Sequence, residues 1–184
     1  MIRPAFRNAV IAQLITMQRV VWIGFGVSVL FYIGVSVWFT RMRQQTAVPS
    51  DVVATLTPAL YALAAAAALL TVWWRRHLAP ENLVAATAAA PAMPATAPAN
   101  AGPGPVPESA AERRAVAVIA RLRTQSIVLW MLSEVPAVFG MVLSVLGGDP
   151  RHALGLGAAS VVLLAMHAPT RARVEAALDA VPKR

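Results

Sequence analysis

Four long apolar runs constrain the fold of this chain more than any other feature. They are Val20–Thr40, Val52–Trp74, Ser126–Gly148 and Ala153–Ala168. About 20 apolar residues at about 1.5 Å per residue cross the ~30 Å hydrocarbon core of a bilayer, and the first three runs reach that length. The fourth run has only 16 residues, and we expect its helix to begin near residue 151. Because a bilayer core offers the backbone no hydrogen bonds, each run is predicted to be a helix.

The composition favours the same class of protein. Only 13% of the 184 residues are charged, 58% are apolar, and the mean hydropathy is +0.63. A soluble domain carries about 25% charged residues. We therefore predict an all-α, polytopic membrane protein with four transmembrane helices in two hairpins. The lipid bilayer is its first expected partner.

The positions of the basic residues predict the orientation. Thirteen of the sixteen Lys and Arg residues lie in the N-terminal segment, the central segment or the C-terminal tail, and three lie in the two remaining loops. The positive-inside rule then places both termini and the central segment in the cytoplasm. No nucleic-acid-binding motif accompanies the net charge of +8, so nucleic acid is not an expected partner.

The runs divide the chain into three parts. Residues 1–77 form the first hairpin, with helices at about 20–40 and 52–74. Residues 78–108 are rich in Ala and hold seven of the 14 prolines, which predicts a disordered cytoplasmic linker. Residues 109–184 hold an amphipathic helix, a second hairpin with helices at about 126–148 and 151–168, and a basic tail.

The second half begins with a capping box, Ser109-Ala-Ala-Glu112, which predicts a helix start. Just beyond it, apolar and basic side chains fall on opposite helical faces: Val118, Ile119 and Leu122 against Arg113, Arg114 and Arg121. This pattern suits a helix on the membrane surface, held by apolar insertion and anionic lipid. A cytoplasmic extension of the third transmembrane helix accounts for the same residues.

Glu134 interrupts the third run and is the main candidate site residue. An acidic residue at a membrane-helix centre costs roughly 2.5–3.5 kcal/mol. The four runs contain no Lys or Arg, and counting residues along the runs places Ser28 and Ser160 at the depth of Glu134. Pro136 removes one backbone donor nearby, which leaves a local opening. We expect a neutral acid, hydrogen-bonded near Ser28 or Ser160; a proton-linked role and the docking of a partner protein are the alternatives.

Small residues predict a close contact between the last two helices. Gly140, Ser144 and Gly148 repeat every four residues, and Gly155 and Ala159 offer the same spacing. Such small-xxx-small spacing lets two membrane helices approach closely.

The residue types argue against an active site. The chain has no cysteine, and its three histidines, His77, His152 and His167, lack ligand spacing. No nucleophile–base pair and no phosphate-binding loop is recognisable. We therefore expect no catalytic residues, no metal and no cofactor.

Parts of the chain resemble two known families. The nine residues Glu134-Val-Pro-Ala-Val-Phe-Gly-Met-Val142 resemble the carboxylate helix of rotary-ATPase proteolipid subunits, which implies that Glu134 carries an ion. More of the chain is similar to a bacterial family of small four-helix inner-membrane proteins of unassigned function. That likeness includes Ile127–Phe139, Leu146–Asp149 and Ala168–Arg173. It implies architecture and location but no activity.

These observations predict a non-enzymatic protein. It would be a small subunit or accessory that packs against itself or against another membrane protein. The alternative is a proton-coupled carrier or channel element that uses Glu134.

Overall fold

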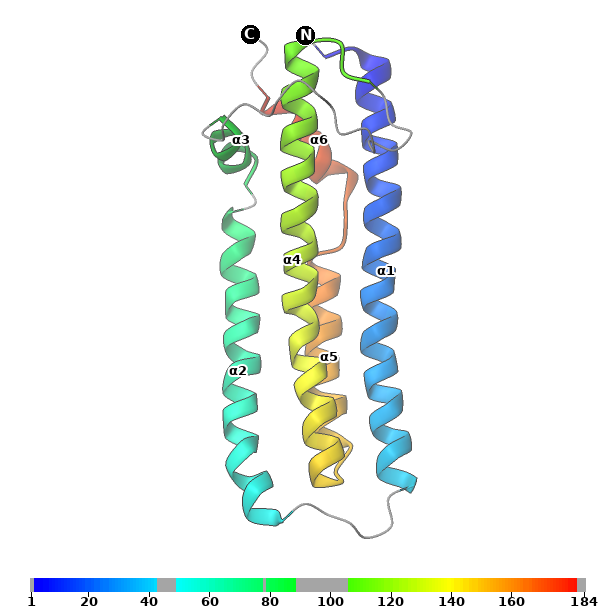
Figure 1. The fold of residues 1–184 in the computed structure, drawn as a ribbon, viewed down its shortest axis with the longest axis vertical. Helices are drawn as coiled ribbons and strands as arrows, with labels where there is room; N and C mark the ends of the chain where they lie inside the picture. Colours follow the sequence, from blue (N-terminus) through cyan, green and yellow to red (C-terminus); the bar gives the residue numbers. More distant parts are fainter. Residues whose placement is uncertain (1, 43–48, 78, 89–105, 182–184) are drawn as a thin grey trace. The chain divides into compact units, whose positions relative to one another are not determined.

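The computed structural model describes residues 2–42, 49–77, 79–88 and 106–181. Within these ranges the chain is helical and contains no strand, which confirms the all-α prediction. The helices are α1 Pro4–Met42, α2 Ser50–His77, α3 Pro80–Ala88, α4 Ala110–Gly147, α5 Arg151–Met166 and α6 Arg171–Asp179 (Figure 1).

The chain folds into two compact units. Unit 1 contains residues 1–20, 76–126 and 169–184, and unit 2 contains residues 21–75 and 127–168. The chain therefore leaves unit 1 twice and returns to it twice. The helices α1 and α4 contribute to both units, because each continues well beyond its apolar run.

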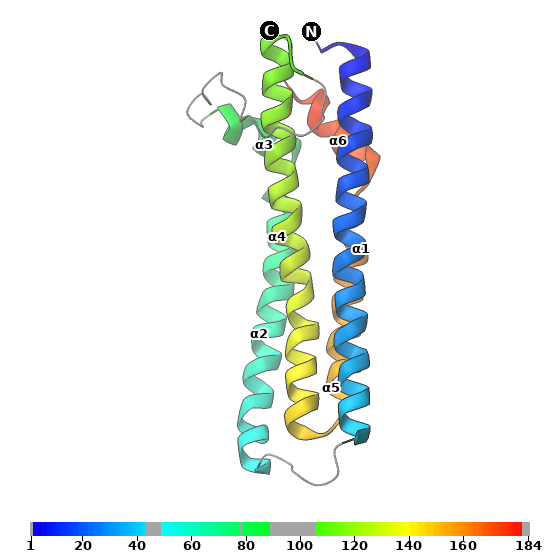
Figure 2. The same cartoon turned by 45° about the vertical axis from the view of Figure 1, so that its right-hand side comes forward.

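Unit 2 is built from the apolar parts of four helices. The helices α1 and α2 lie on either side of α4, and α5 packs behind α4 (Figures 1 and 2). One core cluster joins Val29 of α1 to Trp130 and Ala137 of α4 and to Leu164 of α5. A second cluster joins Ala64 of α2 to Leu143 and Leu156. Each of the first two helices thus packs on the α4–α5 pair.

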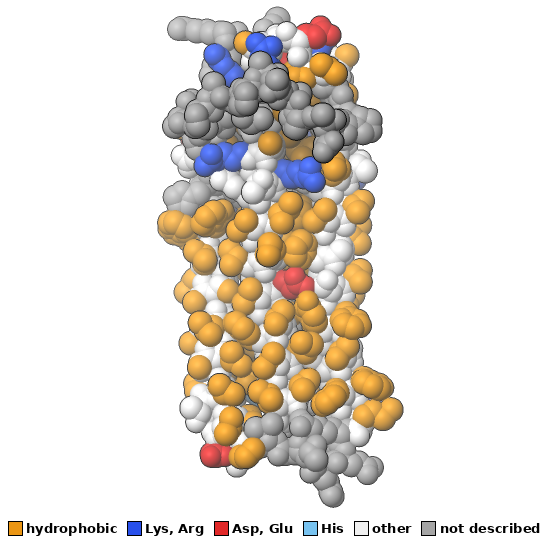
Figure 3. Space-filling model, in the orientation of Figure 1, with side chains coloured by type: hydrophobic (Ala, Val, Ile, Leu, Met, Phe, Trp, Pro, Cys, Tyr) orange, Lys and Arg blue, Asp and Glu red, His pale blue; other side chains and the backbone are white. Residues whose placement is uncertain are grey.

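The outside of unit 2 is apolar. Large hydrophobic side chains such as Leu30, Phe31 and Leu69 are more than 60% exposed, and apolar side chains cover the face over α1, α4 and α2 (Figure 3). Three helices, α1, α2 and α4, are long and apolar enough to cross a membrane. A fourth span requires α5 and α6 to be counted together. The sequence predicts four membrane crossings, and the structure supports three to four.

Two helix boundaries differ from the sequence-based expectation. The first helix begins at Pro4 rather than near residue 20. The capping-box helix does not form a separate surface helix, because α4 runs without interruption from Ala110 to Gly147. The helical extension was therefore the correct alternative. Its apolar residues Val118 and Leu122 are buried within unit 1, so this face is covered by protein.

The segment predicted as a linker is partly structured. Helix α3 occupies Pro80–Ala88 and contacts α6, and Leu83 is only 1% exposed. The prediction of a disordered linker was therefore wrong for Pro80–Ala88, which forms a helix that contacts the far end of the chain. Residues 89–105, most of the predicted linker, and the last three residues of the basic tail lie outside the described part.

An ion-pair network joins two helix starts in unit 1. Glu112 is fully buried; its Oε1 accepts from Arg3 Nε at 2.8 Å and its Oε2 from Arg3 Nη2 at 3.1 Å. The capping box is present: Glu112 N donates to Ser109 Oγ at 3.1 Å, and Ser109 N donates to Glu112 Oε2 at 3.3 Å. Glu108 adds a second carboxylate, 2.6 Å from Arg3 Nη1. A carboxylate is favourable at the N-terminus of a helix, so Glu112 stabilises the beginning of α4. Its ion pair with Arg3 also links the beginning of α1 to that of α4.

We expect the contribution of Glu112 to be lost in acid. It lies in the arginine-rich start of α4, outside the apolar run. The hydrogen bond from Arg3, with those from the backbone of Glu108, Arg3 and Ser109, lowers its pKa from 4.5 to about 2. A lowered folded-state pKa contributes stability that is complete above the unfolded value and disappears as pH falls to the folded value. The melting-temperature difference between wild type and Glu112→Gln in detergent should therefore be largest above pH 4.5 and shrink towards pH 2. A difference independent of pH would contradict this.

Candidate functional site: an outward-facing carboxylate on α4

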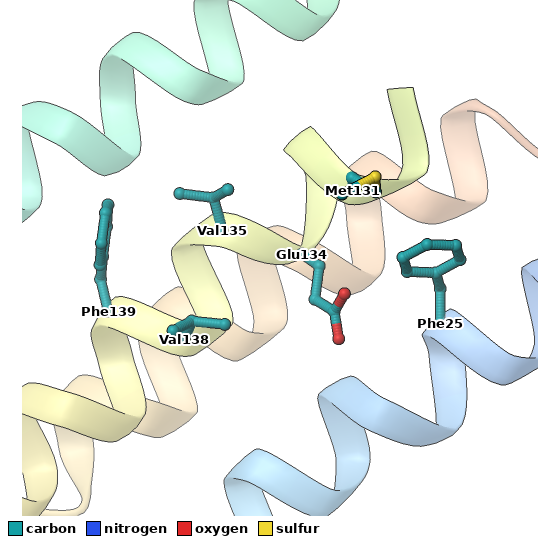
Figure 4. A pocket seen from close by; sticks show the side chains of 6 residues that line it. All are labelled: Phe25, Met131, Glu134, Val135, Val138 and Phe139. Carbon is teal, nitrogen blue, oxygen red and sulfur yellow. The ribbon is translucent and has the colours of Figure 1, made fainter. Parts of the chain in front are cut away.

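Glu134 lies on the face of α4 that is turned outward between α1 and α2. It is half-buried, and its carboxylate points towards α1 rather than into the α4–α5 contact (Figure 4). The carboxylate forms part of a shallow groove of about 330 Å³. Its lining residues are Phe25, Met131, Glu134, Val135, Val138 and Phe139. Every other lining side chain is apolar, so Glu134 is the only polar feature of the groove.

The groove follows α4. Its lining positions on α4 are spaced by three, four, seven and eight residues from Met131, the spacing of one helical face. They cover about two turns, or about 12 Å along the axis. Phe25 of α1 closes one side, and Phe139 points towards α2 (Figure 4). This shape is an elongated, open strip rather than an enclosed cavity.

The expected serine partners do not contact Glu134. The Ser28 hydroxyl donates to Gly24 O on its own helix at 3.2 Å. Ser160 is fully buried on the α5 side of α4, where its hydroxyl accepts from Ala137 N at 2.9 Å. Counting residues along the helices therefore did not predict the direction of either hydroxyl. Tyr32 is the polar neighbour instead, because its side chain interacts with the Glu134 carboxylate.

Within the described ranges, no Lys or Arg side chain forms an ion pair with Glu134. Arg3, Arg7 and Arg171 form ion pairs within the described ranges, and all three belong to unit 1. Glu134 belongs to unit 2, whose apolar runs contain no Lys or Arg. The carboxylate therefore has a hydroxyl neighbour and no counter-ion.

Next to Pro136, a side chain of α5 forms a hydrogen bond with the backbone of α4. Proline removes one donor from the helix and disturbs the preceding turn. Beside it, Ala137 N donates across to Ser160 rather than only within α4. Pro136 and Ser160 thus belong to the helix contact behind the carboxylate and help to position this stretch of α4.

The contact between α4 and α5 is close at Gly140 and Ser144. A Cβ on Gly140 would lie 2.8 Å from His152 O and 3.0 Å from Leu156 Cβ. Ser144 Oγ accepts from Ala153 N at 2.8 Å, which satisfies one of the free donors at the start of α5. This is the packing that small residues permit.

Three predicted contact positions lie elsewhere. Gly155 and Ala159 are exposed, and Gly155 has no neighbour for an added Cβ within 4 Å. Gly148 ends α4 with a φ of +71°, a conformation that favours glycine, and its N–H donates to Ser144 O. The small residue of α5 that the sequence missed is Gly157, which faces the Ile33 side chain of α1.

Two tryptophan side chains donate hydrogen bonds to carbonyls at the end of α5. Trp22 Nε1 donates to Leu164 O at 2.9 Å, and Trp130 Nε1 donates to His167 O at 3.0 Å. Both carbonyls lie at the C-terminal end of α5, where the Leu164 carbonyl also accepts from His167 N at 3.1 Å. Sequence reasoning missed both contacts, because no local pattern connects either indole to α5.

The remaining candidates form no chemical centre. Arg113, Arg114 and Arg121 are exposed on α4 in unit 1. The Tyr61 hydroxyl lies 3.1 Å from His152 Nδ1. Within the described ranges, no group of three or more His, Asp or Glu side chains could hold a metal ion.

Comparison with known proteins finds no matching family model, no matching curated protein and no matching solved structure. The resemblances to proteolipid subunits and to a four-helix inner-membrane family therefore stay expectations from short sequence stretches. Any function must be argued from the residues themselves.

Proposed function

We propose that the protein is a non-enzymatic, multi-pass subunit of a bacterial inner membrane that assembles laterally with another membrane protein through the outer face of α4. The observation that carries this proposal is the half-buried Glu134 carboxylate in an otherwise apolar, outward-facing groove. A lipid-facing surface needs no charge, and a carboxylate in hydrocarbon is costly. A neighbouring protein that covers the groove would offset that cost.

The organisation of unit 1 supports the proposed orientation. Residues from the N-terminal segment, the centre and the C-terminal segment pack together there, and Arg7 pairs with Asp179 at 2.8 Å. With two excursions from unit 1, four crossings would leave both termini on one side. The excess of arginine in the same three segments makes the cytoplasm that side.

Site-specific photo-crosslinking in intact membranes tests the proposal. A photoreactive residue at Met131, in the groove, should give a discrete protein adduct, because a partner would lie against it. Val162 on α5 is the matched control, since the two side chains are 56% and 58% exposed. An adduct at twice 19.4 kDa would identify a second copy, and another mass a different protein. Lipid adducts alone from both positions would contradict lateral assembly.

The alternative function is a proton-coupled carrier or channel element. The observation that favours it is the Tyr32 hydroxyl beside Glu134, because such a pair can exchange a proton within an apolar region. On this alternative, Glu134→Gln would fold normally and abolish pH-dependent flux in proteoliposomes. Lateral assembly requires no such flux.

A further inference from the structure

We infer that the occupant of the groove is a transmembrane helix of a different protein, and that this helix presents a Lys or Arg side chain to Glu134. The inference rests on the proposed lateral assembly and specifies the chemistry of the partner. It follows from the shape of the groove, from the charge within it and from the composition of this chain.

The shape of the groove suits a helix. The strip from Met131 to Phe139 is open and follows one helical face for about two turns (Figure 4). The helix that carries it, α4, lies between α1 and α2 (Figure 1). A protein segment inside a bilayer must satisfy its own backbone, so a peptide occupant at this depth is a helix. Val135 and Val138 flank the carboxylate and supply the apolar contacts that a packed helix needs.

The charge in the groove selects a cationic partner. Glu134 has no counter-ion within the described ranges. A basic residue on a neighbouring helix would be equally unfavourable alone in hydrocarbon, so the two groups gain by pairing. Ionisable residues inside membranes characteristically pair with one another in this way.

A second copy of this chain is a poor occupant. Its four apolar runs contain no Lys or Arg, so a symmetric contact would bring one carboxylate towards another without adding a cation. The arginines on either side of Glu134 in the sequence, Arg123 and Arg151, lie outside the runs. The cation must therefore come from another molecule.

Synthetic helices of defined composition provide the test. The full-length protein, labelled with a donor fluorophore, is reconstituted in phosphatidylcholine vesicles with acceptor-labelled Leu/Ala helices of about 23 residues. Three peptides carry Lys, Gln or Leu at the midpoint and are otherwise identical. Energy transfer should show the Lys peptide binding at least about tenfold more tightly than the Gln or Leu peptide, which corresponds to about 1.4 kcal/mol.

Variants of Glu134 test whether the preference for the Lys peptide depends on this carboxylate. Glu134→Gln should remove the preference for the Lys peptide, whereas Glu134→Asp should retain part of it because the charge remains. Equal binding of all three peptides to the wild type would overturn the inference, and this comparison stays valid if Glu134→Gln fails to fold. Energy transfer between two wild-type copies that excludes the Lys peptide would also overturn it, in favour of a homodimer.

Failure of this inference can be told apart from failure of the proposed function. A discrete heterologous adduct at Met131 together with no preference for Lys means that assembly occurs without a cation. Absence of any protein adduct at Met131 would contradict the proposed lateral assembly itself.

Discussion

Replacing Trp130 by alanine should destabilise the protein by about 3–5 kcal/mol, the range for removing a large aromatic side chain from a packed core. Trp130 is only 2% exposed and belongs to the cluster that joins α1, α4 and α5. Its indole also donates to His167 O at the end of α5. The change would therefore leave a cavity and an unsatisfied carbonyl together. Unfolding in mixed micelles by denaturing detergent measures the loss.

Two controls separate the causes. Trp130→Phe keeps most of the apolar volume but loses the N–H, so it should cost about 1–3 kcal/mol. Trp38 of α1 is 60% exposed, and Trp38→Ala should stay within about 0.5 kcal/mol. If Trp130→Ala and Trp38→Ala destabilise equally, the contact between Trp130 and the end of α5 is not important for the fold.

Gly140→Ala and Gly155→Ala should change stability in opposite directions. An added Cβ at Gly140 meets the His152 carbonyl oxygen at 2.8 Å and the Ala153 Cα at 3.1 Å. Because backbone atoms cannot swing aside, α4 and α5 must separate, at a cost of about 1–3 kcal/mol.

The matched glycine on α5 lacks this constraint. An added Cβ at Gly155 has nothing within 4 Å, so alanine should stabilise that helix by up to about 1 kcal/mol through its higher propensity. The same micelle unfolding assay measures both changes. Stabilisation by Gly140→Ala would show that the two helices are not in close contact.

The sequence alone determined the features that depend on local geometry. The rise per residue and the length of the apolar runs predicted helices over most of α1, α2, α4 and α5, and the Ser109–Glu112 spacing predicted the capping box that begins α4. These are properties of one segment at a time. The spacing of Gly140 and Ser144 also indicated a contact face on α4, because small side chains leave room for a neighbour.

Only the tertiary structure decided which way each helix faces. Residue counting placed Ser28 and Ser160 at the level of Glu134, yet each helix is rotated so that neither hydroxyl reaches the carboxylate and Tyr32 lies beside it. For the same reason Gly157 rather than Gly155 meets another helix.

Helix α3, on which Leu83 is buried, likewise contacts α6, which lies almost ninety residues later in the chain. Rise along an axis is fixed by backbone hydrogen bonds, whereas rotation about the axis and the choice of neighbour are set by side-chain packing between distant segments.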